Sequence, residues 1–219
     1  MKKILIAALM AGVASTAFAA DLPTKKAAPP PVSAAYAAPA FSWTGFYLGI
    51  NGGYNYGSFR GAGNATFGHP VGGAFGGQAG YNYQIGQFVL GVEDNLDWSG
   101  ARNSNTVGAN SFTSRVNMTN TLFGRAGIAL DRALIFGEAG YSGAEVKGVD
   151  NGLALSSQGW RSGVGVGAGL EYAITNNVSA RADYVWSYLG QKTYFAGTPD
   201  QVKTGLDLSQ VRAGLNYKF

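Results

Sequence analysis

The chain has 219 residues, of which only 13% are charged, and it contains no cysteine. A disulfide framework and a thiolate metal site are therefore excluded, and a charge content about half the usual level of roughly 25% argues against an ordinary water-facing surface. The formal charge of +4 falls to +2, with 14 basic and 12 acidic residues, once Lys2 and Lys3 are removed with a leader. We therefore expect no nucleic-acid partner.

The first 42 residues predict a leader followed by a spacer. The start, MKKILIAALMAGVASTAFAADLP, has two lysines, an apolar run too short to span a membrane and small residues at Ala17 and Ala19. This pattern predicts a secretory signal peptide over residues 1–19, cleaved after Ala19. Residues 20–42 are rich in Pro and Ala without a hydrophobic period, which predicts an extended periplasmic spacer.

From residue 43 to residue 219, apolar and polar residues alternate with the period of a β-strand. In the segment TGFYLGINGGYNY, for example, Phe46, Leu48 and Ile50 share one face. The pattern predicts eight strands, at about 44–56, 73–84, 88–98, 116–130, 133–146, 159–173, 178–189 and 206–219.

The connections between these segments alternate in length. Those at 84–87, 131–132 and 174–177 are tight turns, whereas those at about 57–72, 99–115, 147–158 and 190–204 are long and polar. Short turns at one end and long loops at the other are typical of a bacterial outer-membrane barrel. We therefore predict an all-β fold, an eight-stranded antiparallel up-and-down transmembrane β-barrel.

Alternation alone does not say which face is inside, because a water-soluble barrel such as a lipocalin shows the same pattern. Two observations favour the membrane barrel. The polar face consists mostly of Gly, Asn, Gln and Ser, which suits a narrow lumen, and aromatic residues gather towards the strand ends as membrane-interface girdles do.

If the apolar face meets lipid, nine charged residues point into the lumen. Charges there must be paired or hydrated, and an eight-stranded barrel is just wide enough for side chains to fill. The first interpretation is an ion-pair network that plugs the lumen, and the alternative is a narrow path for ions or small solutes. No nucleophile or cleft accompanies the carboxylates, so we expect no enzyme. The nine residues are Glu93, Asp97, Arg125, Glu138, Arg161, Glu171, Arg181, Asp183 and Arg212.

Two further motifs carry little chemistry. The glycines of GVGVGAG, residues 163–169, recur at every second position and so form one face of a strand, unlike the G-x-G-x-x-G of a phosphate-binding loop. His69 is the single histidine and lies in a predicted loop. It is most simply a solvated residue, and haem or metal ligation is the alternative.

The long loops carry an excess of basic residues, with six cations, Lys147 among them, against Asp150 and Asp200. Because Arg and Lys pair well with phosphate, they could contact lipopolysaccharide at the outer leaflet. Ordinary solvated loop charge is the alternative. The candidate contacts are Arg60, Arg102, Arg115, Lys192 and Lys203.

Several segments together resemble a known family. They are WTGFYLGINGGYNYG, FVLGVEDNLDWSG, GRAGIALDRALIFGEAGYSGA, GVGAGLEYAITNNVSARADYVWSYLG and the final VRAGLNYKF. The chain is similar over residues 41–219 to the small porin-like outer-membrane proteins of alphaproteobacteria, the 25/31-kDa surface-antigen group with an OmpA-like or opacity-like barrel.

The resemblance implies an abundant structural protein of the Gram-negative envelope that supports envelope integrity and surface interaction. It also implies three possible partners. The mature start Ala20-Asp21 matches members joined to peptidoglycan, Tyr217 and Phe219 match the aromatic strand end read by the barrel assembly machinery, and some relatives are associated with haem or porin activity. A narrow-channel porin and a haem- or host-ligand-binding surface protein are therefore the alternative functions.

Overall fold

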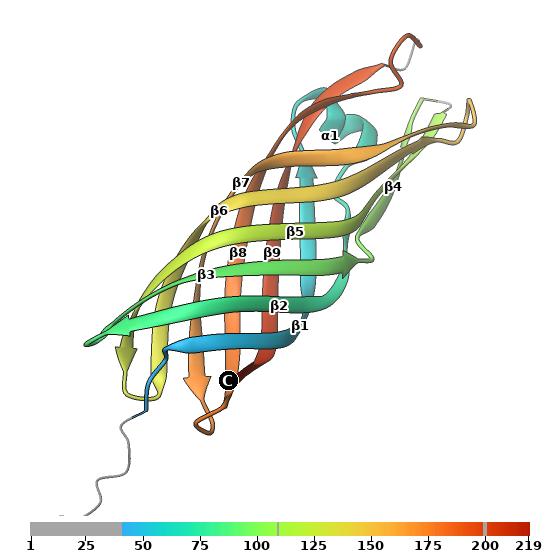
Figure 1. Cartoon of the computed structure of the whole chain (residues 1–219). Helices are drawn as coiled ribbons and strands as arrows, with labels where there is room; N and C mark the ends of the chain where they lie inside the picture. The colour runs from blue at the N-terminus through green and yellow to red at the C-terminus, as the bar shows by residue number, and fades with distance from the viewer. Residues whose placement is uncertain (1–40, 109, 199–200) are drawn as a thin grey trace, which may run out of the picture. The chain divides into compact units, whose positions relative to one another are not determined.

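A closed ring of antiparallel strands forms the body of the computed structural model, which describes residues 41–108, 110–198 and 201–219 (Figure 1). The predicted signal peptide, the start Ala20-Asp21 and most of the predicted spacer lie outside these residues. The elements in chain order are β1 (Gly45–Phe59), α1 (Ala62–Phe67), β2 (Val71–Ile85), β3 (Phe88–Ser99), β4 (Arg102–Val107), β5 (Asn110–Leu130), β6 (Ala133–Asp150), β7 (Leu155–Ala173), β8 (Val178–Tyr194) and β9 (Val202–Lys218).

The ring has eight strand positions. β1 pairs with β2 on one side and with β9 on the other, so the first and last strands close the sheet without leaving an edge. The short β4 continues β3 along the same neighbour, because β3 pairs with the later part of β5 and β4 with its first residues. The predicted eight-stranded antiparallel barrel is confirmed.

Three tight turns lie at one end of the barrel, which we call the turn end. They join β2 to β3, β5 to β6 and β7 to β8, as the sequence predicts. Gly86 in the first turn has a φ of 61°, a left-handed conformation that glycine adopts without steric cost. The C-terminus and the start of β1 lie at this same end (Figure 1).

At the opposite end, the loop end, the sequence placed the strand boundaries wrongly. Much of the expected loops at 99–115, 147–158 and 190–204 is strand, since β5 begins at Asn110, β6 ends at Asp150 and β8 ends at Tyr194. Both faces are partly polar there, so the hydrophobic alternation fades while backbone pairing continues. The expected loop at 57–72 likewise contains α1.

A β-bulge changes which residues of β5 face inward. The register with β6 shifts between Val116 and Met118, leaving Asn117 as an extra residue. Above the bulge, even-numbered residues such as Ser114 are buried, and below it odd-numbered residues such as Thr121 are buried. A second register shift lies in β8 between Leu189 and Lys192.

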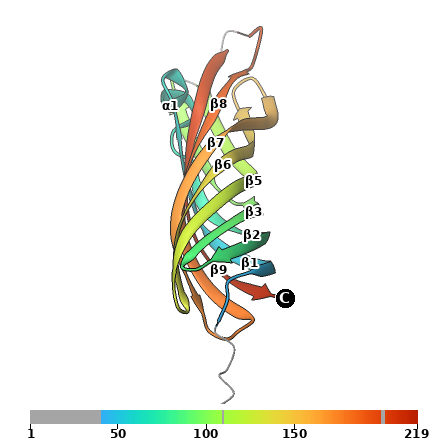
Figure 2. The ribbon, with the colours of Figure 1, turned by 60° about the vertical axis from the view of Figure 1, so that its left-hand side comes forward.

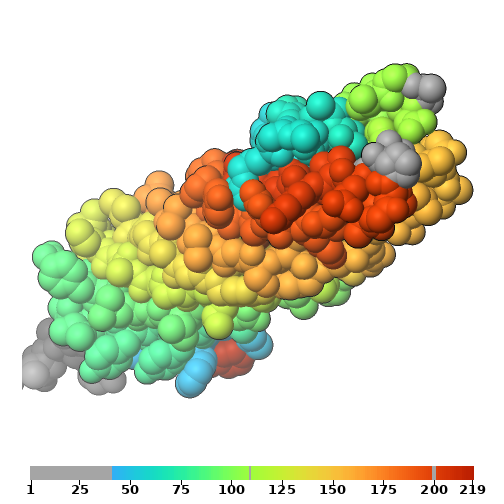
Figure 3. All heavy atoms as spheres, turned by 90° about the horizontal axis from the view of Figure 1, so that it is seen from above, coloured from blue at the N-terminus to red at the C-terminus, as the bar shows by residue number. Residues whose placement is uncertain are grey.

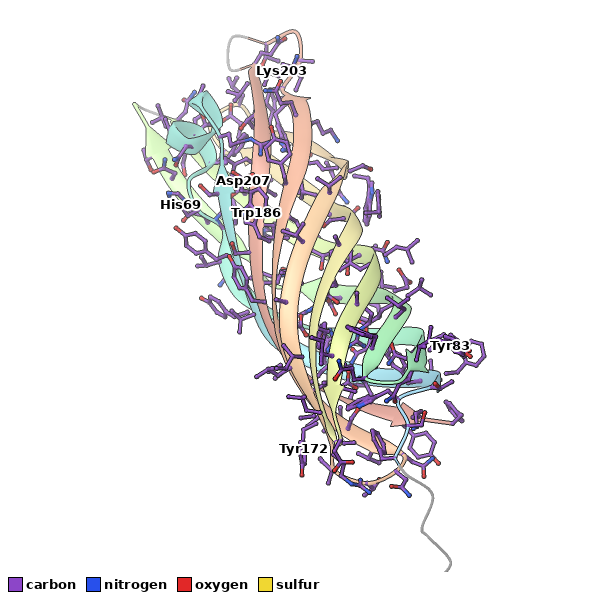
Figure 4. All side chains as sticks on the ribbon, turned by 90° about the vertical axis from the view of Figure 1, so that its left-hand side faces the viewer. His69, Tyr83, Tyr172, Trp186, Lys203 and Asp207 are labelled. Atoms are coloured by element: carbon purple, nitrogen blue, oxygen red, sulfur yellow. The ribbon has the colours of Figure 1, made fainter. Side chains whose placement is uncertain are left out.

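The outer wall of the barrel is apolar and exposed. Phe46, Ile50 and Val164 have 67%, 69% and 62% of their surface exposed, which a water-soluble barrel would avoid and a lipid-facing wall requires. The strands wind obliquely around the barrel (Figure 2). Tyr83 and Tyr172 lie towards the turn end and Trp186 lies nearer the loop end, as expected of two aromatic girdles (Figure 4).

The helix α1 lies at the loop end of the barrel. It contacts β1, β4, β5 and β9, and its segment lies beside β9 in the space-filling view (Figure 3). Among the described residues, no helix has both the length and the apolar character needed to cross a membrane.

Candidate functional site

The alternation of each strand sends one set of side chains into the lumen, and all nine predicted lumen residues are buried there. Small residues on β7 make room for them. A Cβ added at Gly169 would lie 2.6 Å from the Cβ of Asp183 and 2.7 Å from a ring carbon of Phe136. Two of the inward glycines of GVGVGAG, Gly167 and Gly169, therefore form a thin part of the wall against which Glu138 and Asp183 pack.

Eight of the nine residues form one ion-pair network, which we call the central network. Glu93 Oε2 lies 2.5 Å from Arg181 Nη1 and 3.3 Å from Arg125 Nη1, and it also accepts a hydrogen bond of 2.6 Å from the Tyr47 hydroxyl. Arg125 reaches further to Glu171, 2.9 Å away. Glu93 therefore accepts from residues of β1, β5 and β8.

A second part of the central network is built around Arg212. Its guanidinium lies 2.7 Å from Asp183 Oδ2 and 3.1 Å from Glu138 Oε1, and Asp97 Oδ2 is 3.9 Å away. Arg181 joins the two parts, because it also contacts Asp183 at 2.9 Å. The network thus contains five carboxylates and three arginines.

Arg161 does not belong to the central network. Its Nε donates to the Tyr194 hydroxyl at 3.0 Å, its guanidinium carbon lies 4.9 Å from the centre of that ring, and Nη1 donates to the Gly190 carbonyl oxygen. Within the described part of the chain it forms no ion pair. The sequence placed it on the correct face but could not give its height in the barrel.

These contacts cross the lumen. In ring order, β3 and β8 lie on opposite sides, so the 2.5 Å contact between Glu93 and Arg181 spans the barrel. Gln210 on β9 likewise donates to Thr119 Oγ1 on β5 at 3.2 Å, and this pair also joins opposite positions. The central network and the contact between Gln210 and Thr119 therefore bridge the middle of the barrel.

An apolar cluster closes the loop end, and we call it the loop-end cluster. Phe67 of α1 inserts into it and packs against Phe59 and Tyr194 at ring-centre distances of 5.1 Å each. Its other buried members are Ala101, Phe112, Val116, Ala144, Val146, Leu189, Phe195 and Leu206.

Sequence reasoning missed the loop-end cluster because it assumed that apolar residues face lipid along the whole strand. Leu206 and Leu208 share the parity of Arg212, and Leu189 shares that of Asp183. If every second residue is counted from the charged residues towards the loop end, the inward-facing positions are occupied by apolar side chains.

A second apolar cluster, the turn-end cluster, closes the other end of the lumen. Trp43, just before β1, is 3% exposed; its backbone N–H donates to Gln84 Oε1 and its indole N–H to the Asp131 carbonyl oxygen. A cavity beside it has a volume of about 20 Å³, room for about one water molecule. The remaining buried members are Val89, Ala129, Leu134, Phe136 and Ala173.

The five basic residues predicted at the loop end have different environments. Arg60 is paired with Asp207 and stacks on Tyr188, with its guanidinium carbon 3.7 Å from the ring centre. Lys192 turns towards the inner side of the wall, where its ammonium donates to the Gln158 carbonyl oxygen at 3.1 Å. Lys203 is exposed.

Arg102 and Arg115, by contrast, are directly opposite each other on β4 and β5. Both side chains are exposed and share the outer face of the barrel. The structure therefore brings together these two of the five.

One outward-facing residue departs from the apolar wall. Asp94 is exposed between Val92 and Leu96 on the lipid-facing side of β3. Its Oδ1 accepts a hydrogen bond of 2.8 Å from the Asn120 amide.

His69 is exposed and stacks on Tyr56, with ring centres 5.7 Å apart and planes 13° apart. Residues 41–108, 110–198 and 201–219 hold no group of three or more His, Cys, Asp or Glu side chains placed for a metal ion.

Comparison with known proteins gives consistent matches along the chain. The family model described as outer membrane protein beta-barrel domain matches residues 5–219. The chain is 33% identical to the 31 kDa outer-membrane immunogenic protein of Brucella melitensis, covering 100% of both chains. It is 36% identical to the 22 kDa outer membrane protein of Rhizobium leguminosarum, covering 83% of this chain and 80% of the other. A solved structure of Ail from Yersinia pestis matches with a TM-score of 0.49 at 15% identity, covering 80% of this chain and 99% of that one.

Proposed function

This chain belongs to the outer membrane protein beta-barrel family and is an outer-membrane protein, and on that premise we propose that it is a structural, non-conducting barrel. Its lumen is plugged by the central network and by an apolar cluster at each end. Its role is to support envelope integrity and to present the loop end at the cell surface.

The observation that carries the proposal is the contact across the barrel between Glu93 and Arg181. The two groups are 2.5 Å apart, and their side chains have 0% and 2% of their surface exposed. Ions that crossed the lumen would have to separate this pair, and separating a buried pair is costly because two desolvated charges lose the attraction between them. A narrow-channel porin, the alternative, would need a continuous water path past both side chains.

Planar-bilayer recording of the refolded full chain tests the proposal. We expect no steady single-channel steps. Heat-modifiable mobility on an SDS gel verifies that the refolded protein used for the recording is folded. Steps of uniform amplitude from verified, folded protein would overturn the plug and leave the narrow-channel porin as the function.

Envelope support has a separate test in cells. A deletion strain should become more sensitive to detergents and bile salts, and expression of the full chain should restore resistance. If the deletion strain and its parent are equally sensitive, the structural role is contradicted even where the barrel proves non-conducting.

We also propose that Ala20-Asp21 forms the mature start and is joined to peptidoglycan, with residues 20–42 bridging from the wall to the barrel. The support is the sequence of this start and its Pro-rich continuation, which lie almost entirely outside the described residues. Muramidase-digested sacculi should yield a peptide that begins at Ala20 and carries a muropeptide mass. Sacculi that yield only unmodified peptide would contradict the attachment.

A last proposal concerns assembly by the barrel assembly machinery. Tyr217 and Phe219 are exposed on the outer side of the closing strand, and their ring centres are 5.2 Å apart. Removal of Phe219 should reduce the amount of heat-modifiable barrel in the membrane, whereas Leu215→Ala on the same face should leave it nearly unchanged. Equal amounts of assembled barrel with and without Phe219 would refute this role.

A further inference from the structure

Three cations form a row across the outer face of the barrel at its loop end, and we call it the basic row. Arg102 on β4 is directly opposite Arg115 on β5, and Arg115 is directly opposite Lys147 on β6. Neighbouring strands are about 4.8 Å apart, and directly opposite side chains share one face. The three positive groups are therefore held side by side by the backbone.

Such a row is unfavourable by itself, because like charges directly opposite each other destabilise a sheet. No ion pair among the described residues includes Arg102, Arg115 or Lys147. The neighbouring carboxylate, Glu145, accepts a hydrogen bond of 2.6 Å from Gln158 instead. The basic row thus has no ion-pair partner in the part of the chain that the structure describes.

The wall is hollowed beside the two arginines. Gly100 and Ala101 lie between β3 and β4, outside both strands, and β5 has its bulge at Asn117. The hollow between them has a volume of about 330 Å³ and is lined by both Arg102 and Arg115.

The position of the basic row along the barrel axis indicates which part of the membrane contacts it. Trp98 is the last exposed aromatic residue on β3 before the hollow. Trp160 on β7 lies directly opposite Glu145, and Glu145 is the outward-facing residue of β6 that precedes Lys147. Exposed tryptophans of a barrel wall mark the membrane interface at the level of the lipid headgroups. The basic row therefore lies just beyond the outer-leaflet girdle, where lipid headgroups contact the wall.

We propose that Arg102, Arg115 and Lys147 bind the phosphate groups of a phosphorylated glycolipid in the outer leaflet, with one phosphate seated in the hollow. Arginine forms paired, charge-assisted hydrogen bonds with phosphate oxygens, and lysine adds a point charge. This assignment deepens the general expectation of lipopolysaccharide contact. It excludes Arg60, which is paired with Asp207, and Lys192, which turns inward, and it adds Lys147.

Native mass spectrometry of the folded full chain in neutral detergent tests the site, with bisphosphorylated lipid A and its dephosphorylated form as probes. We expect the wild type to bind the bisphosphorylated form more tightly. The Arg102→Gln/Arg115→Gln variant should lose at least about tenfold in affinity, which corresponds to about 1.4 kcal/mol. The affinity of Arg102→Lys/Arg115→Lys should lie between those of the wild type and Arg102→Gln/Arg115→Gln, because lysine keeps the charge but cannot form the paired hydrogen bonds of arginine.

The matched control is Arg132→Gln/Lys218→Gln, which removes the same charge at the turn end of the barrel, away from the basic row. It should bind as the wild type does, and heat-modifiable mobility shows that each variant is folded. Equal affinity of wild type and Arg102→Gln/Arg115→Gln would overturn the proposal, as would an equal loss in the control. Complete displacement of the glycolipid by inorganic phosphate would also refute it, since the site would then recognise free phosphate.

This inference rests on the outer-membrane setting of the proposed function but not on a closed lumen. Glycolipid binding and single-channel conductance are measured separately, so either result can fail while the other holds.

Discussion

Replacing Arg181 with methionine should test whether the middle of the barrel is dry. The side chain is 2% exposed and contacts Glu93 at 2.5 Å and Asp183 at 2.9 Å. Arg181→Met keeps much of the side-chain length but removes the positive charge. Glu93 retains Arg125 and Asp183 retains Arg212, yet the network would then hold five carboxylates and two arginines.

The size of the loss follows from burial. Removal of one partner from a buried ion pair costs about 3–5 kcal/mol, because the remaining charge is desolvated without compensation. Arg60→Met is the matched control: its pair with Asp207 has 26% and 29% of the two side chains exposed. A surface pair of this kind contributes only about 0–1 kcal/mol.

The assay is the free energy of unfolding in urea, followed by tryptophan fluorescence of protein refolded into lipid vesicles. We expect the loss for Arg181→Met to exceed that for Arg60→Met by at least about 2 kcal/mol. Adding Glu93→Gln to Arg181→Met should cost less than the sum of the single changes, by about 0.5–3 kcal/mol, because the two side chains are in contact. Similar losses for both arginine variants would mean that the network is hydrated, and the argument for a plugged lumen would fail.

Four further predictions concern single residues of the wall, the lumen and the loop end. Asp94→Leu should raise the free energy of unfolding in vesicles by about 1–2 kcal/mol, because it removes a carboxylate from the lipid-facing wall; a loss of stability would instead indicate that the bond to its amide partner dominates. Phe67→Ala should lower the free energy of unfolding by about 3–5 kcal/mol, and an unchanged urea midpoint would mean that α1 does not seal the loop end. Gly169→Val should abolish the heat-modifiable form because its Cβ would collide inside the lumen, whereas Gly124→Val, where the nearest heavy atom to an added Cβ is 3.9 Å away, should fold. His69→Ala should bind hemin in titration as weakly as the wild type, and a large loss would assign the single imidazole a role in haem binding.

The strand pattern was predictable because lipid on one side and packed polar groups on the other impose strict alternation. Glu93 and Arg212 could be placed on the lumen face from parity alone. Their partners could not, because Glu93 and Arg181 are 88 residues apart and meet only through the curvature of the closed ring. Parity gives the face of a residue but neither its height nor its position around the barrel.

The loop end was the least predictable part for a different reason. Beyond the lipid the outer face no longer needs apolar residues, so the alternation that revealed the strands disappears while β5, β6 and β8 continue. Phe67 was read as part of a long polar loop, since nothing local in the sequence says that α1 folds back into the barrel. Arg60 looked free because its partner, Asp207, lies 147 residues away.

The extra residue in β5, Asn117, has a consequence for how this chain can change in length. Removing it would join Val116 directly to Met118, and these two residues already pair with the consecutive residues Val146 and Glu145 of β6. Phe112 and Val116 would stay inside and Arg115 would stay outside, because the alternation on the two sides of the bulge would simply become continuous. A one-residue deletion at the bulge therefore preserves the facing of each side chain, whereas the same deletion within a regular stretch of strand would exchange inside for outside on one side of it. Natural changes of one residue in the length of this segment should therefore occur at the bulge.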